Sequence, residues 1–299
     1  MFVSQVALGL AATTLVAAVP VTKRMAAIDD ATILNYALTL EHLENTFYRE
    51  GLAQFSEQDF ADAGFDADFV ANVKTVAADE ADHVNFLTTA LTAAGATPVK
   101  ECTYDFGYND VKSFLATASI LEGVGVSAYL GAAADIMAKS TLTAAGSILT
   151  VEARHSAYIR DAIDQAPFAQ PFDTPLTYNQ VFSLASPFIT ECPSDNPALP
   201  VKAFPALAVQ ADGEIKTGST ITLLTPDYTV VAPEGGKIFA AFIAVTGPTF
   251  VEATAVEGGF TVEIPEGFAG QTYAVLTGCN EGVSDDTTAA GPALIEISS

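Results

Sequence analysis

A repeated order of glutamate and histidine over four helical segments restricts what this 299-residue chain can fold into. Along the sequence come a single glutamate, a Glu-x-x-His motif, a second single glutamate and a second Glu-x-x-His motif. The single glutamates are 81 residues apart, from 41 to 122, and the motifs are 72 residues apart, from 80 to 152. This repeat indicates a duplicated pair of helices. Its residues are Glu41, Glu80 and His83, followed by Glu122, Glu152 and His155.

The spacing of these residues has a chemical consequence. Residues three apart on a helix lie on the same side, so each Glu-x-x-His motif aims a carboxylate and an imidazole at one point. Four packed helices would bring four carboxylates and two imidazoles together, which is the ligand set of a di-iron or di-manganese carboxylate site. We therefore expect two Fe or two Mn ions as cofactors, held by the six residues of the repeat.

The sequence around the second pair of helices indicates that the glutamates are buried. Apart from Glu122 itself, the stretch Ile120–Val126 is uncharged, and Glu152 directly follows the uncharged stretch Gly146–Val151. Glutamates buried together without metal would be very costly, and some would have to be protonated. One Glu-x-x-His motif alone is common on solvated helix faces, so the prediction depends on the complete repeat. A relic of the pattern that no longer binds metal is the alternative.

Further residues are candidates for positions around this site: Glu44, Tyr48, Tyr129 and Arg154. Glu44 is one turn from Glu41 and is either an additional ligand or a solvated residue. Each tyrosine follows a single glutamate by seven residues, and either packs over the site or is an ordinary core aromatic. Arg154 either pairs with a carboxylate, such as Asp135 or Glu44, or lies on the surface. Asp82, inside the first motif, is expected to face solvent.

Apolar residues recur at helical spacing in four long segments, residues 30–50, 67–94, 110–137 and 141–164. Asp30 can cap the first segment and Gly95 ends the second. The break between the last two, near residues 139–140, contains neither glycine nor proline. Together these segments predict a four-helix bundle over residues 25–165.

The pattern changes after residue 165. Residues 166–205 are rich in proline, which excludes a helix-rich segment and predicts an ordered wrap or linker. Residues 206–299 contain short β-branched and aromatic runs separated by turns such as Glu-Gly-Gly, and predict a small antiparallel β-sandwich. The expected fold class is therefore α + β multidomain. The runs are STITLLT, YTVVA, IFAAFIAVT, FVEATAV, FTVEIP, YAVLT and ALIEI.

Residues 1–24 predict export. Residues 6–19 are apolar or small and uncharged, which is typical of a secretory signal peptide, and Lys23-Arg24 is similar to a fungal propeptide-processing site. A buried N-terminal helix is the alternative. We expect a secreted protein, extracellular or in the cell wall, that starts at Met25 if the dibasic pair is cut.

The chain has three cysteines. Cys102 and Cys192 lie in loop-like segments flanking the same helical region, so they are the favoured disulfide in an oxidising compartment. Cys279 is then left over, and is free, buried or available for an intermolecular bond.

The charge balance excludes two classes of partner. Lys and Arg number 12 against 36 Asp and Glu, giving a net charge of -24. Nucleic acids and anionic membranes bind through clustered cations, so we expect no nucleic-acid partner. After the signal peptide no run reaches the ~18 uncharged apolar residues of a membrane span. The 50% apolar content excludes intrinsic disorder.

Residues 30–165 resemble the secreted ferritin-like domain proteins of the fungal stress-response and plant desiccation-related type. The matching stretches are LNYALTLEHLENTFY, DEADHVNFL, LEGVGVSAYLGAA and ILTVEARHSAYIR, and the region from FDTPLTYNQ to CPSDNPALPVKAFPAL is also similar. The resemblance does not clearly extend to residues 206–299. It implies a ferritin-like bundle and a di-metal centre, with the six residues of the repeat on ligand positions. It does not fix a reaction, because members of the superfamily oxidise iron, reduce peroxide, desaturate or hydroxylate.

Two functions from different classes follow. The first is a secreted oxidoreductase, ferroxidase-like or manganese-catalase-like, that acts on Fe(II), oxygen or peroxide and has a stress-protective role. A small-molecule oxidant would be its partner. Iron storage is disfavoured, because it needs a hollow shell of many subunits. The second is a non-enzymatic extracellular or cell-wall protein whose β-sandwich binds a wall polymer or a protein, with a structural or vestigial metal site.

Overall fold

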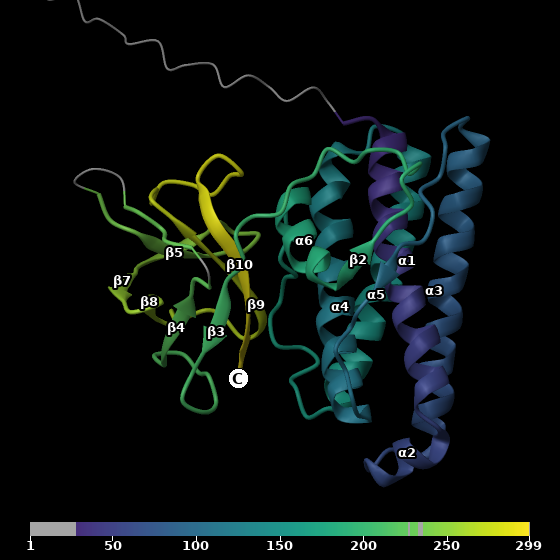
Figure 1. Cartoon of the computed structure of the whole chain (residues 1–299), viewed down its shortest axis with the longest axis horizontal. Coiled ribbons are helices and arrows are strands. Elements are labelled where there is room, and N and C mark those ends of the chain that lie inside the picture. Colours follow the sequence, from purple (N-terminus) through teal and green to yellow (C-terminus); the bar gives the residue numbers. More distant parts are fainter. Residues whose placement is uncertain (1–27, 227, 233–235, 299) are drawn as a thin grey trace, which may run out of the picture.

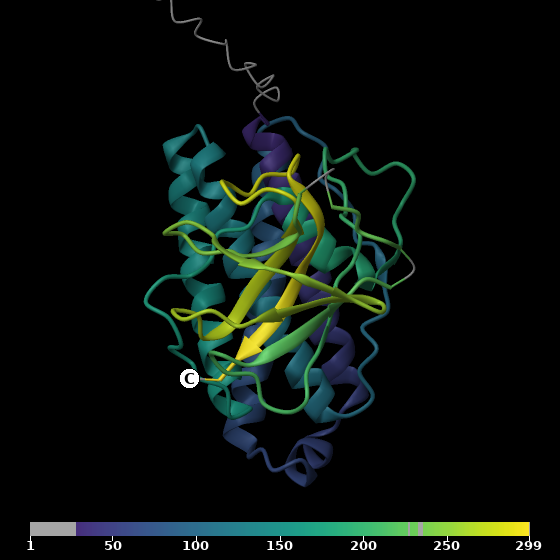
Figure 2. The same ribbon diagram turned by 90° about the vertical axis from the view of Figure 1, so that its left-hand side faces the viewer.

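The computed structural model describes residues 28–226, 228–232 and 236–298. The predicted signal peptide and the Lys23-Arg24 pair lie outside these residues. The described chain has a helical part followed by antiparallel sheets, so the fold class is α + β (Figure 1). Figure 2, in which the sheets face the viewer, shows the strands crossing in front of the helices.

Four long helices form most of the helical part. The first three begin after aspartates, Asp29, Asp66 and Asp110, each of which accepts a backbone N–H from the residue three positions later. Their boundaries follow the predicted apolar periodicity closely at most ends. The four are α1 (Asp30–Gln54), α3 (Ala67–Ala93), α4 (Val111–Ala132) and α5 (Lys139–Ala162).

The end of α4 and the start of α5 differ from the predicted residues 137 and 141. The helix α4 stops at Ala132 and continues as a 3₁₀ turn, η1 (Ala133–Asp135). No side chain of its own segment caps α5. Instead the Asp30 carboxylate of α1 accepts the backbone N–H groups of Met137 and Ala138, each at 2.9 Å. The boundary is therefore fixed by a residue more than one hundred positions away in the sequence.

Two short helices bring the described α-helices to six, so the expected count of four is too low. They are α2 (Glu57–Asp62) and α6 (Tyr178–Ala185). Each begins with a capping box, formed by Ser56 with Asp59 in α2 and by Thr177 with Gln180 in α6. The second lies in the proline-rich region, where the stretch between Pro175 and Pro187 is free of proline and long enough for two turns.

The proline-rich region otherwise follows the helices as an ordered strap. It contains a 3₁₀ turn, η2 (Ser186–Phe188), and strand β2 (Ile189–Glu191), which pairs antiparallel with β1 (Thr103–Tyr104). Beside this pair, Cys102 and Cys192 form a disulfide that closes a separation of 90 residues. Cys279 is a free, partly exposed thiol.

Residues 206–298 form two four-stranded antiparallel sheets. Their orders are β3-β4-β8-β7 and β10-β9-β5-β6, with every neighbouring pair antiparallel. The run YTVVA at 228–232 is not a strand, so that prediction is wrong; a proline on each side, at 226 and 233, removes donors from any ladder there. The strands are β3 (Ala208–Gln210), β4 (Thr220–Leu224), β5 (Phe239–Phe242), β6 (Thr249–Glu252), β7 (Thr254–Val256), β8 (Gly259–Glu263), β9 (Gly270–Thr277) and β10 (Thr288–Ile297).

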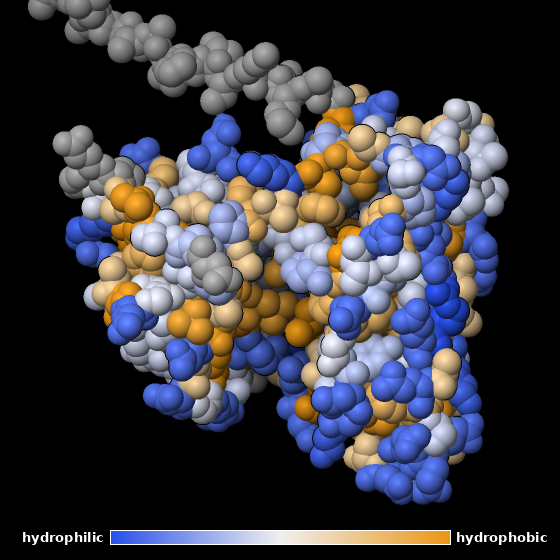
Figure 3. All heavy atoms as spheres, viewed as in Figure 1, coloured by the Kyte–Doolittle hydropathy of each residue, from blue (hydrophilic) through white to orange (hydrophobic). Residues whose placement is uncertain are grey.

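The β10-β9-β5-β6 sheet is the middle layer of the molecule. One face packs against the other sheet through residues such as Leu223, Phe242 and Ile295. From the opposite face, Tyr273 of β9 donates its hydroxyl to the Gly123 carbonyl of α4 at 3.1 Å. Hydrophobic residues gather in the hollow between the sheets and the helices on the face shown in Figure 3.

An ion pair also joins the two parts. Arg160 of α5 is 5% exposed, and its guanidinium donates to both carboxylate oxygens of Glu296 on β10, at 2.9 and 2.7 Å. Two parallel hydrogen bonds fix orientation as well as distance. The sheets are therefore held against the helical part by polar contacts as well as by apolar packing.

Among the described helices, the segment Val111–Asp135 has the length and apolar composition of a membrane span, and most of it is buried inside the protein.

Candidate metal centre

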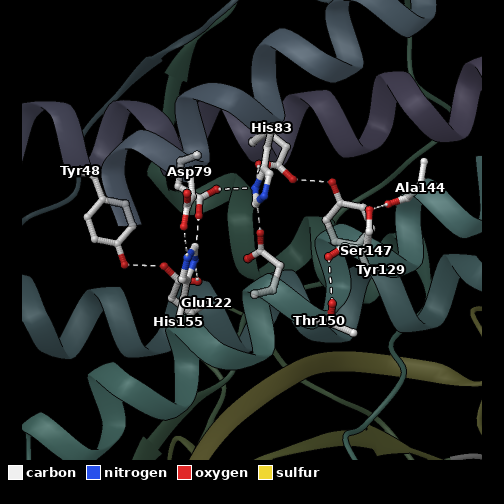
Figure 4. A network of polar contacts seen from close by, with 12 residues as sticks. Tyr48, Asp79, His83, Glu122, Tyr129, Ala144, Ser147, Thr150 and His155 are labelled. Carbon is white, nitrogen blue, oxygen red and sulfur yellow. Dashed lines mark hydrogen bonds and ion pairs between the residues drawn. The ribbon is translucent and has the colours of Figure 1, made fainter. Parts of the chain in front are cut away.

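The six residues of the repeat converge in the interior of the helical part. Figure 4 shows His83, Glu122 and His155 among them. The four glutamates are 0% exposed, and His83 and His155 are 8% and 6% exposed. Each of the four long helices contributes: Glu41 from α1, Glu80 and His83 from α3, Glu122 from α4, and Glu152 and His155 from α5.

One group of ligand atoms surrounds His83. Its Nδ1 atom lies 3.2 Å from Glu41 Oε2, 3.2 Å from Glu80 Oε2 and 3.2 Å from Glu152 Oε1. One ligand atom from each of these four residues lies within 4.8 Å of all the others. This is a separation that one metal ion could span.

A second group surrounds His155. Its Nδ1 atom lies 3.0 Å from Glu80 Oε1 and 3.4 Å from Glu122 Oε2. Ligand atoms of Glu80, Glu122, Glu152 and His155 again lie within 4.8 Å of one another. Because Glu80 and Glu152 belong to both groups, the two positions share a pair of carboxylates and form one centre.

The two tyrosines hold the unshared glutamates. The Tyr129 hydroxyl donates to Glu41 Oε1, and the Tyr48 hydroxyl donates to Glu122 Oε1. In each case the other oxygen, Oε2, faces the histidine of its group. The sequence left open whether these tyrosines were core aromatics; their hydroxyls lie on the site itself.

The two histidines differ in whether a carboxylate contacts the ring nitrogen that faces away from the centre. His155 Nε2 lies 3.1 Å from Asp79 Oδ2, whereas the position that corresponds to Asp79 in the second motif is Val151. Asp79 was missed by sequence reasoning. Its position directly before Glu80 could have indicated this role, because it places the Asp79 side chain toward the neighbouring helix α5.

Glu44 and Gly125 complete the lining of the centre. Glu44 is 4% exposed, so the solvated alternative is wrong, but it belongs to neither group of ligand atoms. A Cβ at Gly125 would lie 2.7 Å from Glu152 Oε2 and 2.9 Å from Glu44 Oε1. The glycine therefore admits both carboxylates against α4, at the cost of about 1 kcal/mol of helix stability relative to alanine.

Comparison with known proteins agrees with this arrangement. Residues 29–165 match the family model described as a ferritin-like domain. These residues form a ferritin-like domain. A relative in Schizosaccharomyces pombe, named Protein rds1, is 29% identical over 174 residues, which are 58% of this chain and 42% of that protein. The match thus spans less than half of the relative's length.

Burial is the main influence on the carboxylates of the ferritin-like domain. It raises the pKa of Glu44 and of Glu152 well above the ordinary value, and repulsion from neighbouring carboxylates adds to the effect. Burial also raises the pKa of Glu41 to about 7, although contact with the His83 imidazole opposes the rise. Without metal, burial therefore favours the protonated form of these carboxylates.

The imidazoles counteract burial at the centre of the cluster. Burial alone would raise the pKa of Glu80, but contacts with both imidazoles bring it down to about 2. Burial alone would lower the pKa of His155, but Glu122 and Glu80 raise it to about 11. The pKa of His83 is raised well above the ordinary value for the same reason. In the absence of metal, the imidazoles thus carry positive charge between the carboxylates.

Protons alone do not satisfy the cluster. Six buried ligand atoms make no hydrogen bond among the described residues, because the contacts of 3.0–3.4 Å between the carboxylates and the imidazoles lack hydrogen-bond geometry. Such atoms are rare in folded proteins. They face the interior of the centre, where a cation would contact them, so the residues present fit a pair of metal ions. The atoms are Glu41 Oε2, Glu80 Oε1, Glu122 Oε2, both oxygens of Glu152, and His155 Nδ1.

Arg154 does not belong to the centre. It is exposed, and among the described residues it pairs with neither Asp135 nor Glu44. Position 154 is two residues beyond Glu152, about 200° around the helix, so its side chain leaves α5 on the opposite side. Asp82 is exposed, as predicted, for the same reason relative to Glu80.

Proposed function

We propose that this chain is a secreted oxidoreductase that holds two iron or two manganese ions in its ferritin-like domain. The observation that carries the proposal is the set of six buried ligand atoms without hydrogen-bond partners, all on the residues that the repeat predicts. Four carboxylates and two imidazoles suit Fe and Mn, and would balance two divalent charges.

The geometry assigns each residue a place. Glu41 and His83 would hold one ion, and Glu122 and His155 the other. Glu80 and Glu152 lie between both positions and would be shared. Binding in this arrangement would replace the protons of the imidazoles and of the raised-pKa carboxylates, because ligands must be deprotonated to coordinate.

The surrounding residues orient the ligands. Tyr129 and Tyr48 each occupy one oxygen of an unshared glutamate and leave the other free to face inward. Asp79 would accept a hydrogen bond from the Nε2–H group of His155, and so keep Nδ1 available as the ligand atom. The packed aromatic and aliphatic side chains around the tyrosines keep bulk water away from the centre.

When bound, two such ions supply redox chemistry toward oxygen or peroxide. Oxidation of Fe(II) and removal of peroxide both fit a protective role under stress. Secretion is supported by the apolar N-terminal segment with its dibasic pair, and by the disulfide between Cys102 and Cys192, since disulfides persist in oxidising compartments. The protein would then act outside the cell or in the cell wall.

The test is metal content followed by turnover. Protein purified from a secreting host, with no metal added, should contain about two Fe or two Mn per chain by elemental analysis. The loaded protein should oxidise Fe(II) or decompose hydrogen peroxide. Glu80→Gln should lose both metal and turnover, whereas Asp82→Asn, an exposed change two residues away on the same helix, should retain them. Absence of metal after exposure to Fe(II) and Mn(II) would refute the proposal.

The sheets favour a second candidate function, a non-enzymatic extracellular or cell-wall protein with a structural metal. They carry none of the centre's residues, yet pack firmly on α4 and α5. In that case Glu80→Gln would lower stability without removing any turnover, because the loaded protein would have none to lose, and a wall polymer or protein would bind the sheets.

A further inference from the structure

An apolar cavity of about 220 Å³ lies in the helical part beside the metal centre. Side chains of α1, α3, α4 and the start of α5 line it, among them Leu40, Phe86, Ala90, Tyr129 and Ala144. The exposed lining residues Phe86, at 47%, and Ser140 mark its opening to the surface, and the buried Leu87 and Tyr129 mark its deep end.

The deep end of this cavity reaches the wall of the metal centre. The Tyr129 ring lines the cavity, while its hydroxyl donates to Glu41 Oε1. Two other lining residues adjoin ligands in the sequence: Leu40 precedes Glu41, and Leu87 lies one helical turn beyond His83. A molecule in the cavity would therefore be separated from the centre by one layer of side chains.

The walls restrict the chemistry of the ligand. All the lining side chains are uncharged, and most are aliphatic or aromatic, so a charged ligand would lose its hydration without compensation. The hydroxyls of the lining residues Tyr36 and Tyr129 already donate to the Tyr178 carbonyl and to Glu41. The hydroxyls of Ser140 and Thr141, at the open end, are the side-chain groups left to hydrogen-bond a ligand. An apolar cavity of about 150 Å³ binds benzene, so by proportion this one holds roughly nine non-hydrogen atoms.

We propose that the cavity binds a neutral molecule of about this size, with an alkyl chain directed toward Tyr129 and a polar end at Ser140 and Thr141. Binding itself does not depend on the proposed function. The placement of the ligand beside a loaded metal centre does rest on it, and this deepens the proposed function by naming the class of compound that reaches the centre.

The first experiment is a chain-length series on the full chain without metal. Calorimetry with 1-butanol, 1-hexanol, 1-octanol, 1-decanol and 1-dodecanol should show saturable binding. The affinity should rise by up to about fourfold per methylene as far as 1-octanol, which has nine non-hydrogen atoms, and then stop rising. Lack of saturable binding, or a constant rise through 1-dodecanol, would overturn the proposal.

Filling the cavity provides matched variants. Ala90→Phe on α3 should weaken 1-octanol binding at least tenfold, while Ala78→Phe, on an exposed face of the same helix, should not. Ala144→Phe fills the cavity from α5 and gives a second test if Ala90→Phe fails to fold. Unchanged affinity in a folded, filled variant would overturn the proposal. The proposal would also be overturned if the wild-type protein were a dimer that binds no alkanol and that Ala90→Phe dissociates. A second copy of the chain would then occupy the cavity.

A measurement on Mn(II)-loaded protein tests the position of the ligand. The paramagnetic ion should broaden the terminal methyl resonance of bound 1-octanol more than the resonance of the carbon bearing the hydroxyl. Broadening strongest at the hydroxyl end would overturn the proposed orientation. If Mn(II) is not retained while 1-octanol still binds the metal-free protein, the proposed function fails and the cavity site stands. If Mn(II) is retained and no alkanol binds, the cavity site fails alone.

Discussion

Replacement of Glu152 by glutamine should change stability in opposite ways with and without metal. Glu152 is 0% exposed, and neither of its carboxylate oxygens makes a hydrogen bond among the described residues, although Oε1 lies 3.2 Å from His83 Nδ1. Burial, with repulsion from the neighbouring carboxylates, raises its pKa well above the ordinary value, so without metal the neutral acid is favoured. Glutamine then replaces one neutral group by another of the same shape. With metal bound, the same substitution removes a shared carboxylate ligand.

The magnitudes follow from these two states. Without metal, Glu152→Gln should alter the free energy of unfolding by about 1 kcal/mol or less. With free metal at about 1,000 times the dissociation constant, each occupied position stabilises the fold by about 4.1 kcal/mol. A ligand substitution that weakens binding about 100-fold leaves roughly 1.4 kcal/mol of this, a loss of about 2.7 kcal/mol per position. For a chain of this size the loss at one position lowers the melting temperature by roughly 5–10 °C, and the loss at both positions that share Glu152 lowers it by roughly 10–20 °C.

The assay is differential scanning calorimetry of both proteins, with and without Mn(II). Glu263→Gln is the matched control, because this glutamate is exposed on β8, far from the ligand set in the sequence. The variant and the wild type should melt together without metal and separate with it. A loss of stability of equal size in both conditions would show that Glu152 has a purely structural role and would refute the reasoning.

Three further outcomes are expected. Mn(II) binding at pH 7 should release at least two protons per chain, one from each imidazole, since the pKa of His155 stands at about 11 before metal binds. Calorimetry in buffers of different ionisation enthalpy measures this release, and a binding reaction that releases no protons would contradict the assignment. The affinity for Mn(II) should also fall as the pH is lowered through the pKa of Glu41, about 7. In titrations, Asp79→Asn should weaken the binding of one of the two Mn(II) ions by 10–100-fold and leave the affinity for the other unchanged. Equal weakening at both positions would contradict the role given to Asp79. Replacing Cys102 and Cys192 by alanine should lower the free energy of unfolding by about 2–5 kcal/mol in urea titrations, because their bond closes a long loop; no change would mean that the strap is held without it.

The buried cluster of glutamates and histidines could be predicted from the sequence because its geometry is local. A Glu-x-x-His motif places two ligands on one helix face whatever the fold, and the repeat identifies which helices meet. Asp79 could not be assigned in this way, because its partner lies 76 positions away on another helix. The burial of Glu44 depends in the same way on the space that Gly125 leaves on α4.

The helix and strand boundaries also divide into those set by local residues, which could be predicted, and those set by distant residues, which could not. The starts of α1, α3 and α4 lie within one or two residues of the predictions, because aspartates in their own segments cap them. The start of α5 was displaced because no side chain caps it, and Asp30 of α1 instead binds the backbone N–H groups of the two residues before it. In the sheets, a β-branched composition predicted a strand at 228–232, but the flanking prolines prevented pairing. Composition describes the preference of a segment, whereas pairing depends on its neighbours.

The position of the sheets links the two parts of the chain to the centre through one helix. Glu122 faces the ligand cluster, and the next residue, Gly123, faces β9, where any Cβ would lie 2.5 Å from the Gln271 side chain. Tyr273 contacts the carbonyl of Gly123 and the hydroxyl of Ser127, so the sheet packs directly against the turns of α4 that carry Glu122. Because a displacement of this helix would move a ligand, the sheets brace the geometry of the centre. Their packing therefore has a consequence for metal binding whether or not they also bind a partner.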